Sequence, residues 1–248
     1  MSENISKKIA LLGQPNSGKS SIFNGLTGLH QHVGNWPGKT VEKKIGTFSH
    51  NNITYEVADL PGSYSLSANS DEEIVTRDYI SKNDLDLVCI LADASQLERS
   101  LYMLADFAGI KTPAMVVLTM IDVAESQGKK INIESLKKKL NIPVCSIVAP
   151  DKKTYSDFFA TLEESVKSPK TIDDSSLYDF FENGEMKAEF IAQKKAVEDL
   201  IKNGSVKKSR RSENWISGKL LEKDEDVLKE FSAVKQAELA TSDGALYA

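Results

Sequence analysis

The stretch "GQPNSGKS" at residues 13–20 decides the fold of this 248-residue chain. It fits the pattern G-x-x-x-x-G-K-[ST], follows the short apolar run "KIALLG" (8–13), and precedes a segment with helical spacing of apolar residues (18–27). Between a strand and a helix, backbone N–H groups and the helix dipole favour a bound anion. We therefore predict a phosphate-binding loop.

Two side chains of this loop have predictable roles toward a nucleotide. Lys19 would reach the β- and γ-phosphates, and the Ser20 hydroxyl would ligate Mg²⁺. The predicted nucleotide-binding residues here are Gln14, Pro15, Asn16, Ser17, Gly18, Lys19, Ser20 and Ser21.

Strand-like and helix-like segments alternate through the first two-thirds of the chain. We expect strands at 8–13, 40–50, 52–59, 86–93, 113–119 and 142–149, and helices at 18–27, 96–109, 132–140 and 155–166. This alternation predicts an α/β domain over residues 1–167, with a mostly parallel six-stranded sheet covered by helices on both faces.

The character of the sequence changes at "SPKTIDDSS" (168–176), which we interpret as a linker. Beyond it we find only helical spacing, in Met186, Phe190, Val197 and Leu200, in Trp215–Leu221, and in Val227, Phe231 and Val234. Residues 177–248 are therefore predicted to form a small all-helical domain.

The composition restricts the function classes. The net charge of −5 gives no indication of a nucleic-acid partner, and we interpret the basic run "KKSRR" (207–211) as a solvated loop. No run approaches the ~20 apolar residues of a membrane-spanning helix, and the N-terminus lacks a secretory signal. We expect a soluble cytoplasmic chain in which Cys89 and Cys145 are buried, reduced thiols.

"DLPG" (59–62) ends the third expected strand, about 40 residues after the phosphate-binding loop. There the Asp59 carboxylate can accept from a magnesium-bound water, and Gly62 can bring its N–H close to the γ-phosphate because it lacks a Cβ. Thr40, between the two motifs, is the candidate for a second Mg²⁺-ligating hydroxyl.

"TMID" (119–122) follows the fifth expected strand and predicts the base. Asp122 can accept hydrogen bonds from the N1–H and the exocyclic amine of guanine, and a buried carboxylate there would reject adenine, which lacks that donor pair. The alternative is an aspartate that only caps the next turn. After the sixth strand, Val148 and Ala149 are placed so that the Ala149 N–H could meet guanine O6.

Several motifs together resemble the cytosolic GTPase portion of the bacterial ferrous iron transport protein B (FeoB) family. They are "GQPNSGKS", "VGNWPGKTVEKK" (33–44), "DLPGSYSLSANSDEE" (59–73) with "RDYI" (77–80), and "DASQLERSLYM" (93–103). The resemblance covers about residues 6–167 and implies a Ras-like P-loop GTPase fold. More thinly, "RRSENWISGKLLEKDED" (210–226) resembles the helical domain that affects GDP release in that family.

The resemblance implies Mg²⁺-dependent, K⁺-stimulated hydrolysis of GTP to GDP and phosphate. It assigns K⁺ to the Asn16 side chain and to the backbone carbonyls of Gly34 and Trp36, where the cation replaces an arginine finger. The residues expected to act in catalysis are Asn16, Lys19, Thr40 and Gly62, and Gly38 and Lys39 join the expected nucleotide site. Ser63 stands where Ras-like proteins carry a water-orienting glutamine, so we expect slow hydrolysis and name no general base.

The chain departs from the family at the base site. Thr119 replaces the asparagine of Asn-x-x-Asp, Val148 and Ala149 replace Ser-Ala, and Pro150 removes one N–H donor. We expect weaker guanine binding from these changes, whereas Asp122 retains the specificity.

The family also implies a partner, the membrane-spanning iron-permeation domain of the same polypeptide, which is absent from these 248 residues. The leading hypothesis is then a GTPase switch on the cytoplasmic face of the bacterial inner membrane. Two alternatives remain: a nucleotide-sensing adaptor, and a free-standing K⁺-dependent GTPase not coupled to iron. A homo-oligomer is left open.

The loop "HVGNWPGKT" (32–40) contains one of only two tryptophans in the chain. Gly34, Pro37 and Gly38 predict an irregular loop, with Trp36 as an apolar plug that steadies it. On this interpretation the Trp36 backbone carbonyl matters more for the cation than its indole ring does.

Overall fold

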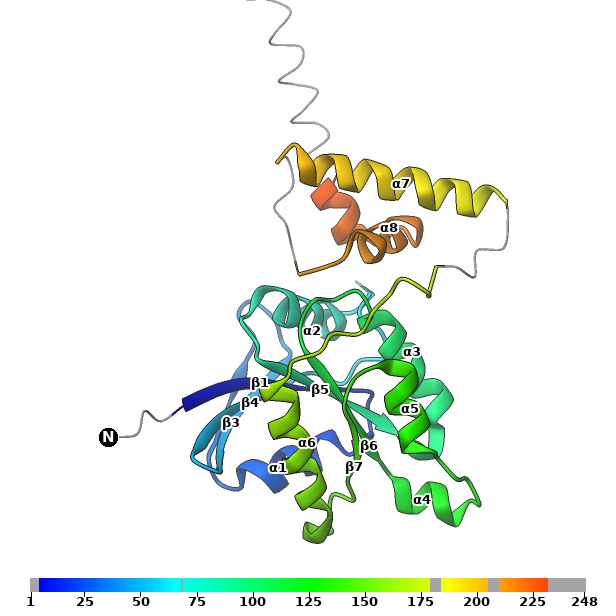
Figure 1. The fold of residues 1–248 in the computed structure, drawn as a ribbon. Helices are drawn as coiled ribbons and strands as arrows, with labels where there is room; N and C mark the ends of the chain where they lie inside the picture. The colour runs from blue at the N-terminus through cyan, green and yellow to red at the C-terminus, as the bar shows by residue number, and fades with distance from the viewer. Residues whose placement is uncertain (1–4, 68, 179–183, 205–209, 232–248) are drawn as a thin grey trace, which may run out of the picture. The chain divides into compact units, whose positions relative to one another are not determined.

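In the computed structural model of the chain, residues 5–67, 69–178, 184–204 and 210–231 are described. The chain divides into two compact units, Met1–Asp173 and Asp174–Ala248. Each unit is described by itself below, and its elements are labelled as in Figure 1.

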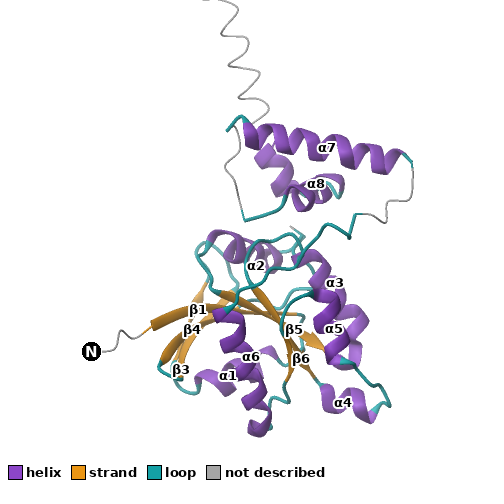
Figure 2. Ribbon diagram, in the orientation of Figure 1, coloured by secondary structure: helices purple, strands orange, loops and turns teal. Residues whose placement is uncertain are grey.

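The first unit is built on a seven-stranded sheet in the order β2-β3-β4-β1-β5-β6-β7 (Figures 1 and 2). The strands are β1 (Ile5–Gly13), β2 (Gln31–Asn35), β3 (Glu42–His50), β4 (Ile53–Asp59), β5 (Leu87–Asp93), β6 (Ala114–Thr119) and β7 (Val144–Ser146). The α/β class and the mostly parallel sheet are confirmed, since only β2–β3 and β3–β4 pair antiparallel.

The expected count of six strands is wrong, because β2 forms within the segment predicted to be an irregular loop. β2 pairs antiparallel with β3 and forms one edge of the sheet. The turn that joins β3 to β4 has left-handed φ values of 47° at Asn51 and 62° at Asn52, as a tight hairpin turn requires.

The parallel register brings the ends of the central strands together. Leu11 of β1 lies opposite Asp59 of β4 and Cys89 of β5, while Asp93 of β5 lies opposite Thr119 of β6. Because the carboxyl ends of parallel strands meet at one edge of the sheet, the loops after them form a common site there.

Two layers of helices cover the sheet. The helices of this unit are α1 (Lys19–Thr27), α2 (Asp71–Lys82), α3 (Leu97–Phe107), α4 (Ile121–Ser126), α5 (Ile133–Leu140) and α6 (Tyr155–Lys167), with short 3₁₀ turns at Ala94–Gln96 and Lys152–Thr154. α1 and α6 cover one face, and Figure 1 shows α2 and α3 on the opposite side. The core on the α1/α6 face includes Ile9, Leu11, Ile22, Phe23, Val57, Val117, Phe158 and Leu162.

The segment after α6 is hydrogen-bonded to the rest of the first unit through Lys170 and Ile172. The Ala114 N–H at the start of β6 donates to the Lys170 carbonyl at 2.9 Å, and the Gly109 N–H donates to the Ile172 carbonyl at 3.2 Å. Both cysteines are buried free thiols, as predicted.

The second unit is helical in its described part, with α7 (Glu185–Lys202), α8 (Glu213–Leu221) and helical residues 225–231. Its core contains Phe190, Val197, Trp215, Ile216, Val227 and Phe231. Met186, which shares the helical spacing of Phe190 and Val197, lies in the first turn of α7 and is 61% exposed. Val234 and the first three residues of the basic run lie outside the described residues, whereas Arg211 forms an ion pair with Glu230 at 2.8 Å.

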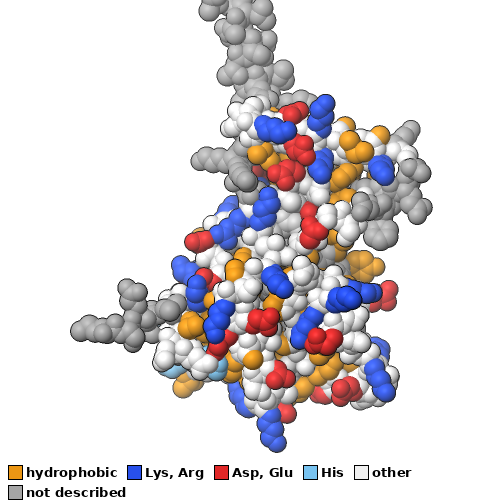
Figure 3. Space-filling view, viewed as in Figure 1, with side chains coloured by type: hydrophobic (Ala, Val, Ile, Leu, Met, Phe, Trp, Pro, Cys, Tyr) orange, Lys and Arg blue, Asp and Glu red, His pale blue; other side chains and the backbone are white. Residues whose placement is uncertain are grey.

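Within the described ranges, every helix is too short or too polar to cross a membrane. On the face shown in Figure 3, positive and negative side chains are interspersed over both units.

Candidate functional site

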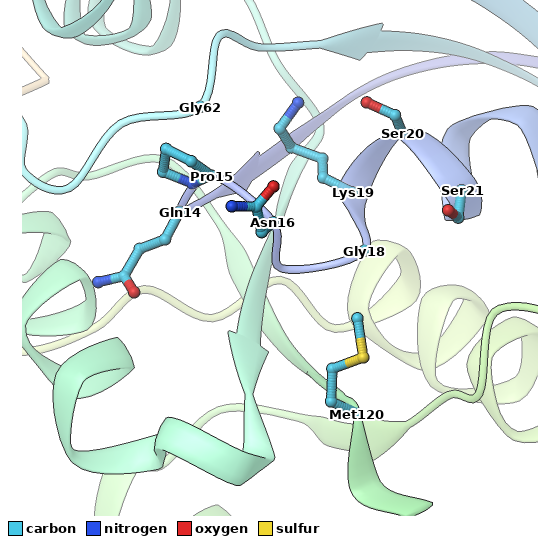
Figure 4. A pocket seen from close by; sticks show the side chains of 9 residues that line it. All are labelled: Gln14, Pro15, Asn16, Gly18, Lys19, Ser20, Ser21, Gly62 and Met120. Carbon is cyan, nitrogen blue, oxygen red and sulfur yellow. The ribbon is translucent and has the colours of Figure 1, made fainter. Parts of the chain in front are cut away.

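The phosphate-binding loop joins β1 to α1 at the carboxyl edge of the sheet. Two of its residues adopt left-handed backbone conformations, Asn16 with φ 66° and Gly18 with φ 81°. Such conformations turn successive N–H groups toward one concave side, which suits an anion. The cavity beside the loop has a volume of about 540 Å³ and is lined by Gln14, Pro15, Asn16, Gly18, Lys19, Ser20, Ser21, Gly62 and Met120 (Figure 4).

The structure thus brings together most of the residues predicted for the phosphates. In Figure 4 Gln14 points away from Lys19, and its amide donates to the Arg99 carbonyl at 2.9 Å. The Gln14 side chain therefore anchors the loop to α3. Ser17 is also turned inward, since its hydroxyl is buried without a hydrogen-bond partner in the described part of the chain.

Lys19 and Asp59 form an ion pair in this cavity wall. Their side chains are only 9% and 5% exposed, and the Lys19 ammonium donates to Asp59 Oδ1. Asp59 lies at the end of β4, so the pair joins the two motifs "GQPNSGKS" and "DLPG" directly. The cation expected on the phosphates and the carboxylate expected near Mg²⁺ thus neutralise one another here.

Gly62 lies against the phosphate-binding loop. A Cβ placed on Gly62 would be 3.3 Å from Cα and N of Pro15, so only glycine fits without displacing that backbone. The next residue, Ser63, is 3% exposed, and its N–H donates to the Gly13 carbonyl at 3.3 Å. Ser63 therefore faces the interior and does not take the place of a water-orienting side chain.

The segment after Gly62 is held by contacts that the sequence analysis missed. The Leu66 N–H donates to Asp106 Oδ2 on α3 at 3.0 Å, and the Ser65 hydroxyl donates to Glu73 Oε1 on α2 at 2.8 Å. Ser70 caps α2 by accepting the Glu73 N–H at 3.2 Å. The spacing of Ser70 and Glu73 is that of a capping box and could have predicted α2.

The residues predicted for the base site lie at the end of β6 and in the turn and helix that follow it. Thr119 is 3% exposed, and its hydroxyl donates to the Ala92 carbonyl at 3.4 Å, so it links β6 to β5. Asp122 lies exposed in the first turn of α4. Met120, which sequence reasoning missed, has a left-handed φ of 53° and approaches Gly18 from below the loop in Figure 4.

The loop after β7 leaves one donor available. The Val148 N–H donates to the Thr154 hydroxyl at 3.0 Å, and the Ala149 carbonyl accepts from the Tyr155 hydroxyl at 3.0 Å. Among the described residues, no hydrogen bond uses the Ala149 N–H.

Residues 29–40, which we call the first switch because they are expected to order around the γ-phosphate, lie apart from the phosphate cavity. Gly34 is in β2, Trp36 follows it, and Thr40 is exposed; none of them lines the 540 Å³ cavity, nor do Gly38 and Lys39. Trp36 and Lys39 instead line a second cavity of about 320 Å³ against α2, together with Pro37, Lys43, Ile74, Val75, Asp78, Tyr79, Lys82 and Asn83. Trp36 is 8% exposed, which confirms that its ring is an apolar plug.

The comparison with protein families decides the relationship. The family model described as "Ferrous iron transport protein B" matches residues 7–162, which is more than half of the chain. The chain belongs to the FeoB family. The resemblance carried by its motifs is therefore confirmed.

Curated FeoB relatives agree with this assignment. The Fe(2+) transporter FeoB of Methanocaldococcus jannaschii is 40% identical over 227 residues, which cover 81% of this chain and 33% of that protein. The Escherichia coli K12 transporter of the same name is 44% identical over 146 residues, covering 57% of this chain and 19% of that protein. The chain thus spans about a fifth to a third of the length of these FeoB relatives.

Solved structures of FeoB cytosolic domains match most of this chain. The cytosolic domain of T. maritima FeoB in its GMPPNP form matches with a TM-score of 0.81 and 36% identity, covering 92% of this chain and 86% of that one. The cytosolic domain of L. pneumophila FeoB matches with a TM-score of 0.78 and 29% identity, covering 93% and 87%. A P-loop G domain followed by a helical domain is therefore the FeoB cytosolic architecture.

Proposed function

We propose that this chain binds GTP with Mg²⁺ and K⁺, hydrolyses it to GDP and phosphate, and acts as the switch of a ferrous iron transporter. The observation that carries the proposal is the phosphate cavity, in which the loop backbone, Lys19 and Gly62 converge beside Asp59. FeoB relatives solved in GMPPNP and GDP forms support the guanine nucleotide as ligand.

The residues of the cavity fit a magnesium nucleotide. When phosphates enter, the Lys19 ammonium exchanges Asp59 for the β- and γ-phosphate oxygens, which frees the Asp59 carboxylate. That carboxylate and the Ser20 hydroxyl form an oxygen donor set of the kind Mg²⁺ prefers, and Thr40 would complete it. Mg²⁺ there would neutralise charge that develops on the transferred phosphoryl group.

Asn16 is the residue of the cavity that fits K⁺. Its amide lies in Figure 4 on the same side of the loop as Lys19. K⁺ held there would stabilise transition-state charge in place of an arginine side chain. Because Ser63 is buried, we assign positioning of the attacking water to backbone groups around Gly62, whose place against Pro15 only glycine allows.

Guanine specificity is proposed to rest on Asp122 and Ala149. Asp122 would accept from the base, and the unused Ala149 N–H would donate to O6. Thr119 would hold the two strands together beneath the base, since its hydroxyl already donates to Ala92. This arrangement gives the threonine a structural role in place of a contact with the purine.

The proposed role of this chain in an iron transporter is based on its membership of the FeoB family. We propose that the G domain (residues 1–167), a linker (168–176) and the helical domain (177–248) form the cytoplasmic switch of a longer polypeptide. Its membrane-spanning part would be the partner that the helical domain contacts.

Hydrolysis in KCl and in NaCl tests the proposal directly. We expect phosphate release from GTP to be clearly faster in KCl, and Asn16→Ala to remove that difference while GDP binding is retained. Gln193→Ala, on α7 of the second unit, is the matched control. Equal, negligible rates in both salts would refute the cation-assisted reaction, and loss of GDP binding in Asn16→Ala would indicate a structural role for Asn16.

A further inference from the structure

The first switch is docked on α2 by its tryptophan. The Trp36 ring meets the Tyr79 ring edge-on, with centroids 5.0 Å apart and an interplanar angle of 69°, and Lys43 Nζ lies 4.9 Å from the Trp36 centroid. An ion pair between Lys39 and Asp71, at 2.6 Å, joins the same two segments. Aromatic and cation–π contacts of this geometry are attractive beyond the burial of area.

Docking occupies the backbone that the cation would need. The Trp36 carbonyl accepts the Lys39 N–H at 3.0 Å, and the Trp36 N–H donates to the Val41 carbonyl at 2.9 Å. Gly34 lies opposite Lys43 in the β2–β3 ladder. These groups therefore serve the hairpin, while the exposed Thr40 lies outside the lining of the phosphate cavity.

One buried polar group destabilises the docked position of Trp36. The Trp36 Nε1–H is buried without a hydrogen-bond partner in the described ranges, and an unpaired buried donor opposes docking. Gly38, with a left-handed φ of 70° and no atom near its Cβ position, allows the loop to bend beside the ring. A contact that combines attraction with such a cost can be released by a modest competing interaction.

We propose that the contact of Trp36 with Tyr79 and Lys43 holds the first switch in an inactive position, and that Tyr79 is a positioning residue that sets how readily GTP recruits Thr40 and the switch carbonyls. The inference rests on the proposed function and adds its regulation. Part of the free energy of GTP binding is used to undock Trp36, whereas GDP, which lacks the γ-phosphate, leaves Trp36 in place. The apparent affinity for GTP therefore equals the intrinsic affinity multiplied by the fraction of chains that are undocked.

Tyr79→Leu in the 248-residue chain tests this, with Tyr79→Phe as the conservative variant that keeps the ring. Tyr102→Leu, at a 69% exposed position of α3, is the matched control. In the nucleotide-free chain, hydrogen exchange of residues 31–41 should become about 2- to 10-fold faster in Tyr79→Leu, as expected from loss of one aromatic pair, and stay unchanged in Tyr79→Phe and Tyr102→Leu.

Nucleotide affinity is the second readout. Tyr79→Leu should bind GMPPNP about 2- to 10-fold more tightly while its affinity for GDP stays the same. Lys43→Met, which removes only the cation–π contact, should change both readouts by about 2- to 5-fold and keeps the test valid if Tyr79→Leu does not fold.

The outcomes separate the two proposals. Unchanged exchange in residues 31–41, or unchanged GMPPNP affinity in a chain that binds and hydrolyses GTP, would overturn this inference alone. Equal gains for GMPPNP and GDP would overturn it as well, because the contact would then not distinguish the two states. Failure of the wild-type chain to bind either nucleotide would refute the proposed function and the regulatory role together.

Discussion

The buried pair of Lys19 and Asp59 makes a sharp prediction about the nucleotide-free chain. Lys19→Met leaves the Asp59 carboxylate, 5% exposed, without its cation. Removing one partner of a fully buried pair costs about 3–5 kcal/mol, whereas an unpaired polar group near water costs about 1–3 kcal/mol. Because the pair borders an open cavity, we expect a loss of about 2–3 kcal/mol.

This loss of stability should lower the melting temperature. At roughly 2–4 °C per kcal/mol for a chain of this size, Lys19→Met should melt about 4–12 °C lower than wild type in differential scanning calorimetry. Asp59→Asn removes the buried negative charge that Lys19→Met leaves unpaired. The double variant Lys19→Met/Asp59→Asn should therefore recover most of the lost stability. The matched control is Lys82→Met, which breaks an exposed pair with Asp78 and should change stability by no more than about 0.5 kcal/mol.

The double-mutant cycle measures the interaction energy between Lys19 and Asp59. Additive effects of Lys19→Met and Asp59→Asn would mean that the two charges do not interact, and the exchange of Asp59 for phosphate would lose its basis. A control variant that melts as low as Lys19→Met would show that any lost lysine, buried or exposed, has the same effect.

Three further predictions follow from the site and the core. Gly62→Ala should weaken GMPPNP binding about tenfold, because its Cβ would lie 3.3 Å from Pro15 and shift the Gly62 N–H that is proposed to meet the γ-phosphate. GDP lacks that phosphate and should bind as before, so equal losses by isothermal titration calorimetry would contradict this. Asp122→Asn should shift preference from guanine to xanthine nucleotides in competition binding, and no shift would remove Asp122 from the base site. Burial raises the pKa of Cys145 to about 12 and also raises that of Cys89, so both thiols stay protonated when folded. Their contribution is complete below the unfolded pKa near 9 and is lost as pH rises toward 12, so urea unfolding should show stability falling above pH 9; stability that rises there would be contrary.

The phosphate site could be predicted from sequence because its geometry is local. The loop at 13–20 and its flanking strand and helix are determined by residues within about fifteen positions, and the end of β4 places Asp59 beside Lys19 through parallel pairing. Long apolar runs such as β5 and β6 were equally predictable, since each is buried on both faces.

Elements without an apolar pattern could not be found in this way. β2 is an edge strand whose five residues are mostly exposed, so no alternation marks it, and only its pairing with β3 makes it a strand. α2 is largely polar and begins with three acidic residues, and its buried side of Val75, Thr76, Arg77 and Ile80 does not follow from hydrophobic spacing alone. Met120 was missed because a left-handed methionine is set by the turn it occupies.

The same contrast explains why the first switch is the least predictable part of the site. Its carbonyl groups have two sets of partners available, the hairpin partners that the structure shows and the proposed cation, and sequence alone does not rank them. Lys19 and Asp59 show the same property, because each is paired with the other where phosphate and Mg²⁺ are proposed to bind. If both proposals hold, ligand binding in this chain exchanges internal partners for ligand atoms. The energy of those internal contacts, measurable at Tyr79 and Lys19, would then set how strongly GTP must bind to turn the proposed switch.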